Sequence, residues 1–331
     1  MRWLDTPEDW GWMLDGWRRV YQAAGVRPGD RLFFGFSFGP FLGFWTAYES
    51  ACREGFLCVP GGGMSSIARL RAMANVQANV LLCTPTYAIH LGDVAAKEGF
   101  DNPSMLSIKK IIVAGEPGGS LPDVRAQIES RWPEASVFDH HGMTEVGPVS
   151  YACPLRPGIL RVMEDRYLAE ILNPENQNPT PPGERGELVL TTLGRTGSPL
   201  IRYRTGDLVR ATPPDDWKDQ DLGLQGGILG RLDSMLLIRG VNIFPSAVET
   251  WIRRFDDIEE FRVTVDRSRP LPELEIEIEP KPEAETRGAE IAKQLQSALQ
   301  THLQLRTPVT PVVPNTLPRF EMKARRWVER A

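Results

Sequence analysis

Apolar runs of strand length alternate with segments of helical period over the first half of the chain. The runs read RLFFGF, GFLCVP, NVLLCT, KKIIVAG and ASVFDH, and segments such as LPDVRAQIESRW lie between them. This alternation is typical of an α/β fold, in which helices cover the faces of a mostly parallel sheet. Ligands of such sheets bind beyond the carboxyl ends of the strands, so the sequence predicts a site there.

The hydrophobic pattern changes twice further along the chain. Pieces such as GELVLTTL and LIRYRTGDLVRA are β-rich, and beyond them FRVTVD and LEIEIEP alternate with period two before the amphipathic segment AEIAKQLQSALQTHL. We therefore expect three parts: an α/β part over 1–155, a β-rich subdomain over 156–229, and a small α+β domain over 230–331.

Composition narrows the class of protein. Of 331 residues, 41% are hydrophobic and 24% charged, and the net charge of -5 gives no reason to expect nucleic acid or an anionic membrane as partner. The most apolar stretch, 32–48, falls short of the ~20 residues of a membrane span and is interrupted by glycine and proline. The four cysteines form no CxxC pair, which favours a reduced, cytoplasmic protein.

Each motif, taken by itself, is compatible with more than one role. In FDHHGMTEVG, Thr144 and Glu145 either hold a phosphate and its metal ion or simply begin the next segment. Asp207 in YRTGDL is typical of a turn, and Lys323 in RFEMKARR of a solvated charge. The order and spacing of these motifs along the chain say more than any one of them.

Taken together, the motifs resemble the adenylate-forming (AMP-forming) acyl-CoA ligase superfamily, and within it the phenylacetate-CoA ligase group. The resemblance covers essentially the whole chain and rests on AGEP, DHHGMTE, GERGELVLTTL, PLIRYRTGDL, GILGRLDSMLLIRGVNIFPSAVE and LPRFEMKARR. It implies an enzyme that activates a small, aromatic carboxylic acid with ATP and passes the acyl group to coenzyme A. Two alternatives stay open: an adenylating enzyme that loads a carrier protein, and a non-enzymatic adenylate-binding remnant.

The resemblance implies a role for each nucleotide-binding residue. Attack of a carboxylate on the α-phosphate brings two anions together, so the site needs cations and donors. Glu145 is expected to bind Mg²⁺, Thr144 the α-phosphate, and Asp207 the ribose hydroxyls, with Arg231 adding donors. Adenine is expected along the remaining positions, where His141 replaces a tyrosine common in relatives: Gly115, Glu116, Pro117, Asp139, His140 and His141.

The resemblance also implies a mobile C-terminal domain with its hinge near Asp233. Lys323 is expected to reach the reacting carboxylate and phosphate, whereas Gly240, Val241 and Asn242 line the path of the CoA thiol. For the acid, Phe36, Phe38 and Phe41 are expected either to form aromatic walls or to pack in the core. A homodimer is compatible with these expectations.

The chain departs from the family pattern in two places. The glycine-rich phosphate loop is missing, because TTLGRTGSP at 191–199 stands in the wrong place in the motif order. The resemblance thus implies a protein or ancestor that began upstream of Met1, and a chain that binds adenylate yet adenylates poorly. Of the zinc ligands found in close relatives only Cys153 remains, and Arg161 replaces the histidine, so we expect no zinc.

Overall fold

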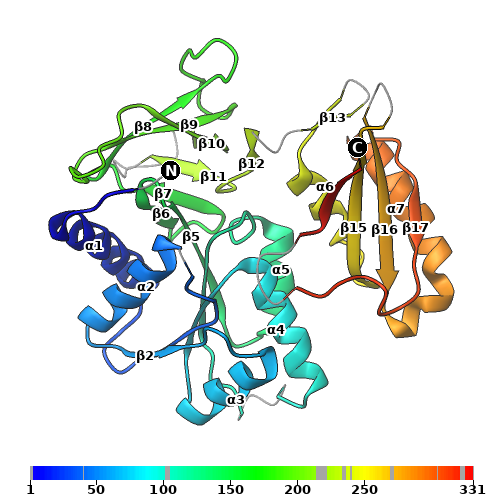
Figure 1. Cartoon of the computed structure of the whole chain (residues 1–331), viewed down its shortest axis with the longest axis horizontal. Helices are drawn as coiled ribbons and strands as arrows, with labels where there is room; N and C mark the ends of the chain where they lie inside the picture. The colour runs from blue at the N-terminus through cyan, green and yellow to red at the C-terminus, as the bar shows by residue number, and fades with distance from the viewer. Residues whose placement is uncertain are drawn as a thin grey trace. The chain divides into compact units, whose positions relative to one another are not determined.

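Figure 1 shows the chain as a computed structural model in which residues 3–39, 41–100, 105–213, 222–232, 236–238, 241–268, 272–303, 305–320 and 325–330 are described. Contacts divide the chain into two units, Met1–Leu229 and Gly230–Ala331. Each unit is described by itself below.

An eight-stranded sheet forms the core of the first unit, with the strand order β11-β7-β6-β5-β4-β3-β1-β2. The first five strands in sequence pair in parallel, and the other three are antiparallel. The five apolar runs of the sequence are thus the parallel strands, and the predicted α/β fold is confirmed. The strands are β1 (Arg31–Phe34), β2 (Leu57–Pro60), β3 (Val80–Cys83), β4 (Lys110–Val113), β5 (Ser136–Met143), β6 (Gly147–Ala152), β7 (Ile159–Val162) and β11 (Gly223–Gln225).

Helices cover both faces of this sheet (Figure 1). Alternate side chains of β1 point to opposite faces, so Phe34 shares a cluster with Trp17 while Phe33 packs with Leu91 in the other cluster. Burial on both faces explains why the parallel strands read as continuous apolar runs. One face carries α1 (Pro7–Ala23) and α2 (Leu42–Arg53), and the other carries α3 (Ser66–Val76), α4 (Pro85–Lys97) and α5 (Pro122–Arg131).

A smaller antiparallel arrangement follows in the same unit. Strands β8 (Tyr167–Leu172), β9 (Arg185–Thr192) and β10 (Tyr203–Arg210) pair in sequence order. The register between β9 and β10 shifts between Arg204 and Leu208, so Asp207 lies at an irregularity of the ladder. Strands β7 and β11, which fall within residues 156–229, pair with the large sheet instead.

The second unit has its own core, in which α7 contributes Ile291, Leu295 and Leu299 from one face. The predicted separate α+β domain is confirmed in its fold, while its role as a mobile lid stays a prediction. Its sheet has the order β17-β16-β15-β18. The elements are β12 (Gly230–Arg231), β13 (Leu236–Ile238), β14 (Val241–Ile243), α6 (Pro245–Ile252), β15 (Ile258–Asp266), β16 (Glu273–Pro280), the 3₁₀ helix η3 (Pro282–Arg287), α7 (Gly288–Leu303), β17 (Val309–Pro311) and β18 (Trp327–Arg330).

Candidate active site

A cavity of about 70 Å³ lies at the carboxyl ends of β1, β3 and β4. Two helices on one face of the sheet, α1 and α2, supply part of its wall. Its lining is mainly apolar, with several glycines that bring backbone close to the space. The lining residues are Trp17, Phe36, Gly43, Phe44, Ala47, Leu82, Cys83, Ile112, Ala114, Gly115, His140, Gly142, Met143, Gly147 and Pro148.

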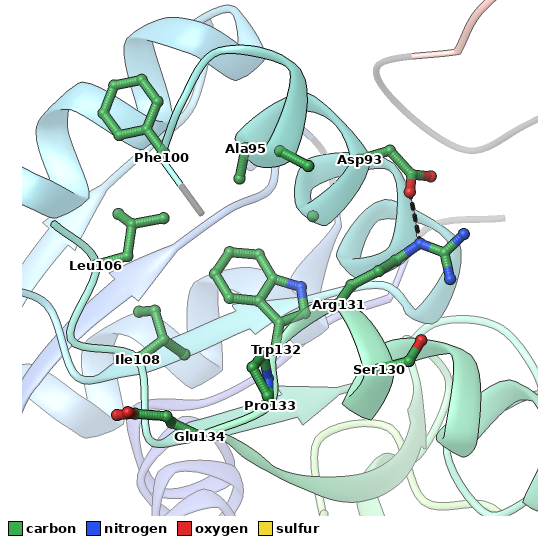
Figure 2. Close-up of a pocket in the computed structure, with 12 residues that line it drawn as sticks. Asp93, Ala95, Phe100, Leu106, Ile108, Ser130, Arg131, Trp132, Pro133 and Glu134 are labelled. Carbon is green, nitrogen blue, oxygen red and sulfur yellow. Dashed lines mark hydrogen bonds and ion pairs between the residues drawn. The ribbon is translucent and has the colours of Figure 1, made fainter. Parts of the chain in front are cut away.

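A larger cavity of about 300 Å³ lies elsewhere in the same unit (Figure 2). Ile108 precedes β4 and Trp132 precedes β5, so this cavity lies at the amino ends of those strands. An ion pair between Asp93 and Arg131, 2.6 Å between Oδ1 and Nε, stands beside it. Because parallel sheets bind ligands at the carboxyl ends of their strands, the smaller cavity is the candidate site.

His140 lies at the wall of the smaller cavity and is 4% exposed. Its Nδ1 lies 2.8 Å from the carbonyl oxygen of Ser150, and its ring stands 4.2 Å from that of Trp17. Burial lowers the pKa of His140 to about 3, so the ring is neutral near pH 7. A carbonyl only accepts, so Nδ1 carries the proton and Nε2 keeps a lone pair.

His141 and Asp207 meet although 66 residues separate them in sequence. Nε2 of His141 donates to Oδ2 of Asp207 at 3.1 Å, and both side chains are largely buried. The pairing of β5 with β6 shifts register between His141 and Gly142. Such an irregularity changes the directions of neighbouring side chains. The structure thus brings together two segments that the family resemblance predicts to bind the nucleotide.

Asp139 is buried, and Oγ of Ser120 donates to its Oδ2 at 2.6 Å. Burial raises the pKa of Asp139 to about 6. A Cβ on Gly119 would come within 2.6 Å of Oδ1, so the carboxyl packs tightly against the loop that follows β4. Asp139 therefore holds the loop after the predicted adenine segment in place.

That segment itself is partly exposed. Gly115 and Pro117 face solvent, whereas the carboxylate of Glu116 accepts from the backbone N–H of Thr86 at 2.8 Å, in the first turn of α4. Gly115 also borders the cavity and has a φ of +93°, a conformation that favours glycine.

Arg195 is a residue that the motif order alone did not single out. Its side chain is buried, and Nη1 donates to the carbonyl oxygens of Thr144 at 2.8 Å and Glu145 at 2.6 Å. Nε and Nη2 donate to both carboxylate oxygens of Asp5. The segment TTLGRTGSP, set aside as a phosphate loop, thus fixes the backbone of the predicted phosphate and metal residues. A buried arginine is not distinguishable from a surface one in sequence.

The three predicted acid-binding phenylalanines occupy different positions. Phe36 lines the cavity and stacks on Phe44, with ring centroids 4.0 Å apart. Phe38 is not among the lining residues and packs against Tyr48. Phe41 is 53% exposed, and its ring is tilted against that of Phe44, with centroids 5.6 Å apart.

The other predicted site residues belong to the second unit. Arg231 lies in β12, and β14 contains the backbone of Val241 and Asn242. Three predicted residues fall outside the described residues: Asp233, expected at the hinge, Lys323, expected to be catalytic, and Gly240.

The described residues also bear on metals and membranes. Within the described ranges, no three or more His, Cys, Asp and Glu side chains gather closely enough to hold a metal ion. In the same ranges, no helix combines the length and hydropathy needed to cross a membrane.

Comparison with protein-family models gives two matches. Residues 12–194 match the family "AMP-binding enzyme", and residues 240–330 match "AMP-binding enzyme C-terminal domain". The first match covers more than half of the chain, so it identifies the family of this protein.

Curated relatives and solved structures agree with this family assignment. The chain is 30% identical to phenylacetate-coenzyme A ligase of Escherichia coli over 322 residues, covering 94% of this chain and 72% of that protein. It is 31% identical to the enzyme of the same name from Aromatoleum evansii over 330 residues, covering 96% and 73%. A crystal structure of 2-hydroxyisobutyryl-CoA ligase matches with a TM-score of 0.87 and 30% identity, over 97% of this chain and 70% of that one. The chain therefore belongs to the AMP-binding enzyme family, within its phenylacetate-CoA ligase-like group.

Proposed function

We propose that the chain activates a small carboxylic acid with ATP and passes the acyl group to coenzyme A. Family membership supports the reaction class, an AMP-forming acid-thiol ligation. ATP and coenzyme A are the co-substrates of that reaction. Because both are abundant inside cells, we also place the protein in the cytoplasm.

The observation that carries this proposal is the hydrogen bond between His141 and Asp207. A carboxylate has two acceptor oxygens, so the side chain of Asp207 suits donors such as ribose hydroxyls. With Nε2 donating to Asp207, Nδ1 of His141 is an acceptor, and among the described residues this buried atom has no hydrogen-bond partner. A nucleotide supplies both kinds of donor, since adenine carries an amino group and ribose carries hydroxyls.

The remaining roles follow from position. Gly142 lines the cavity two residues before Thr144, so an acyl group in the cavity would lie near the residues assigned to the phosphate. We assign the α-phosphate to the hydroxyl of Thr144 and Mg²⁺ to Glu145. When bound, Mg²⁺ would neutralise phosphate charge, and a carboxylate oxygen suits such a hard cation. Arg195 would keep these two residues from shifting.

The acyl group would occupy the cavity between Phe36, Phe44 and Met143. Named relatives act on phenylacetate, and one solved neighbour acts on 2-hydroxyisobutyrate. Stacked aromatic rings beside a small space support a compact acid, either aromatic or branched.

The ribose role of Asp207 is testable by calorimetry with AMP. We expect Asp207→Ala to weaken AMP binding by ~2 to 3 kcal/mol, because it removes the charged acceptor of two hydroxyls. Asp93→Ala, at the larger cavity, serves as the matched control and should bind AMP like the unmodified protein. Unchanged AMP affinity in Asp207→Ala, with thermal unfolding showing a folded protein, would remove the ribose role.

The ligase activity is testable by supplying acyl-AMP and coenzyme A to the chain and following thioester formation. This half-reaction needs no triphosphate. A protein that binds neither AMP nor acyl-AMP, and forms no thioester from any acid tried, would contradict the proposed function.

A further inference from the structure

The wall of the candidate acyl cavity contains a buried hydrogen-bond donor without a partner. Trp17, from α1, lines the cavity and is 5% exposed. Among the described residues, its Nε1 has no hydrogen-bond partner. A buried N–H without a partner is uncommon and costs folding free energy, so such a group usually meets a ligand or an ordered water.

The same wall contains an acceptor. Nδ1 of His140 donates to Ser150, which leaves Nε2 as the acceptor of the neutral ring. Nε2 lies on the side of the cavity-lining residue Gly142, because a Cβ built on that glycine would be 3.3 Å from it. Within the described part of the chain, the hydrogen bond of the His140 ring is the one that Nδ1 makes with Ser150. The rings of His140 and Trp17 are 4.2 Å apart, so the donor and the acceptor belong to one small region.

We propose that this cavity selects an acyl group that carries a hydroxyl, which donates to Nε2 of His140 and accepts from Nε1 of Trp17. The inference rests on the proposed function, since it takes the cavity as the acyl site. It assigns the substrate class as hydroxy acids.

The chemistry of the pair disfavours groups that only donate or only accept hydrogen bonds. An ammonium group only donates, so it would leave Nε1 of Trp17 unpaired and bury a charge among apolar side chains such as Phe36 and Ile112. A ketone only accepts, and would leave His140 unpaired. An unsubstituted hydrocarbon would leave both atoms unpaired. A site built to bond a hydroxyl rejects the analogue that lacks it, because its own polar groups then stay buried and unsatisfied.

The test uses acyl sulfamoyladenosines, stable analogues of acyl-AMP, in matched pairs with and without the hydroxyl. Suitable pairs are hydroxyisobutyryl with isobutyryl and para-hydroxyphenylacetyl with phenylacetyl. Titration calorimetry on the full chain gives the ratio of affinities within each pair. We expect the hydroxylated member of at least one pair to bind about tenfold tighter or more.

Two variants assign this preference to the two side chains. Trp17→Phe keeps an aromatic ring and removes the donor. His140→Asn keeps an N–H for Ser150 and removes the Nε2 acceptor. Each should bring the affinity ratio to within about threefold of one. Trp132→Phe is the matched control, because its indole N–H bonds Ala88 beside the other cavity, and it should keep the ratio.

The outcomes separate this inference from the proposed function. If AMP and the analogues bind but no pair shows a preference, hydroxyl selection is wrong and the proposed function stands. A preference that persists in both Trp17→Phe and His140→Asn overturns the assignment to this pair. If neither AMP nor any analogue binds, the proposed function fails, and this inference fails with it.

Discussion

At the scale of single residues, the site depends on side chains that act through others. Arg195 touches no residue assigned to the acid, yet its guanidinium holds the carbonyls of Thr144 and Glu145 and is itself held by Asp5. The planar fork of arginine suits such a multiple contact, whereas the single ammonium of lysine does not. We therefore interpret Arg195 as a positioning residue.

Replacing Arg195 by methionine should destabilise the protein by about 1 to 3 kcal/mol, because the carbonyls of Thr144 and Glu145 and the partly exposed carboxylate of Asp5 lose their hydrogen-bond donor. Arg202→Met is the control, since the exposed ion pair of Arg202 with Glu170 should contribute less than about 1 kcal/mol. Urea unfolding measures both. A positioning role further predicts that Arg195→Lys, when folded, lowers kcat for acyl-AMP formation more than it raises KM for the acid. Equal stability of Arg195→Met and Arg202→Met would contradict this view of Arg195.

At the scale of elements, α1 connects the fold to the site. The helix begins with a capping box, in which Thr6 and Asp9 satisfy each other's backbone N–H groups. Asp9 also accepts from the N–H groups of Thr196 and Gly197, so the start of the helix holds the loop that carries Arg195. Further along, Gly16 lets α1 approach β6 at Pro148, another residue of the cavity wall.

Two glycine substitutions in α1 test this close approach. A Cβ on Gly16 would come within 2.6 Å of Cγ of Pro148, whereas a Cβ on Gly11 would meet nothing within 4 Å. We expect Gly16→Ala to destabilise the protein by about 1 to 3 kcal/mol, because the proline ring cannot move aside cheaply. Gly11→Ala should stabilise it by up to about 1 kcal/mol, since alanine favours a helix. Urea unfolding that ranks the two variants equally would show that α1 does not pack closely at Gly16.

At the scale of the whole molecule, the chain consists of two units with separate cores. The resemblance places Lys323 in the second unit and gives it a part in only one half-reaction. The restriction of Lys323 to one half-reaction stays a prediction.

Lys323→Ala should lower acyl-AMP formation by about 100-fold or more, because it removes a positive charge from the transition state of that step. Transfer of the acyl group from supplied acyl-AMP to coenzyme A should change little, since that half-reaction does not use this charge. Pyrophosphate release and thioester formation report the two steps separately. Lys293→Ala, an exposed lysine of α7, is the control. An equal loss in both half-reactions would contradict the assignment of Lys323 to one step.

The sequence alone determined the parallel strands, the separate C-terminal domain and the family. Hydrophobic periodicity and the order of motifs can be recognised along the chain without knowledge of the fold. It did not determine which distant side chains meet. Arg195 and Asp5 lie 190 residues apart, and His141 and Asp207 lie 66 apart. Nor does any local pattern mark the indole of Trp17 as part of a cavity wall, since a tryptophan on an amphipathic helix is equally at home in an ordinary core. Such contacts form only when folding brings distant segments together, and burial then determines which polar atoms have a hydrogen-bond partner. The arrangement of the candidate site is therefore a property of the tertiary structure.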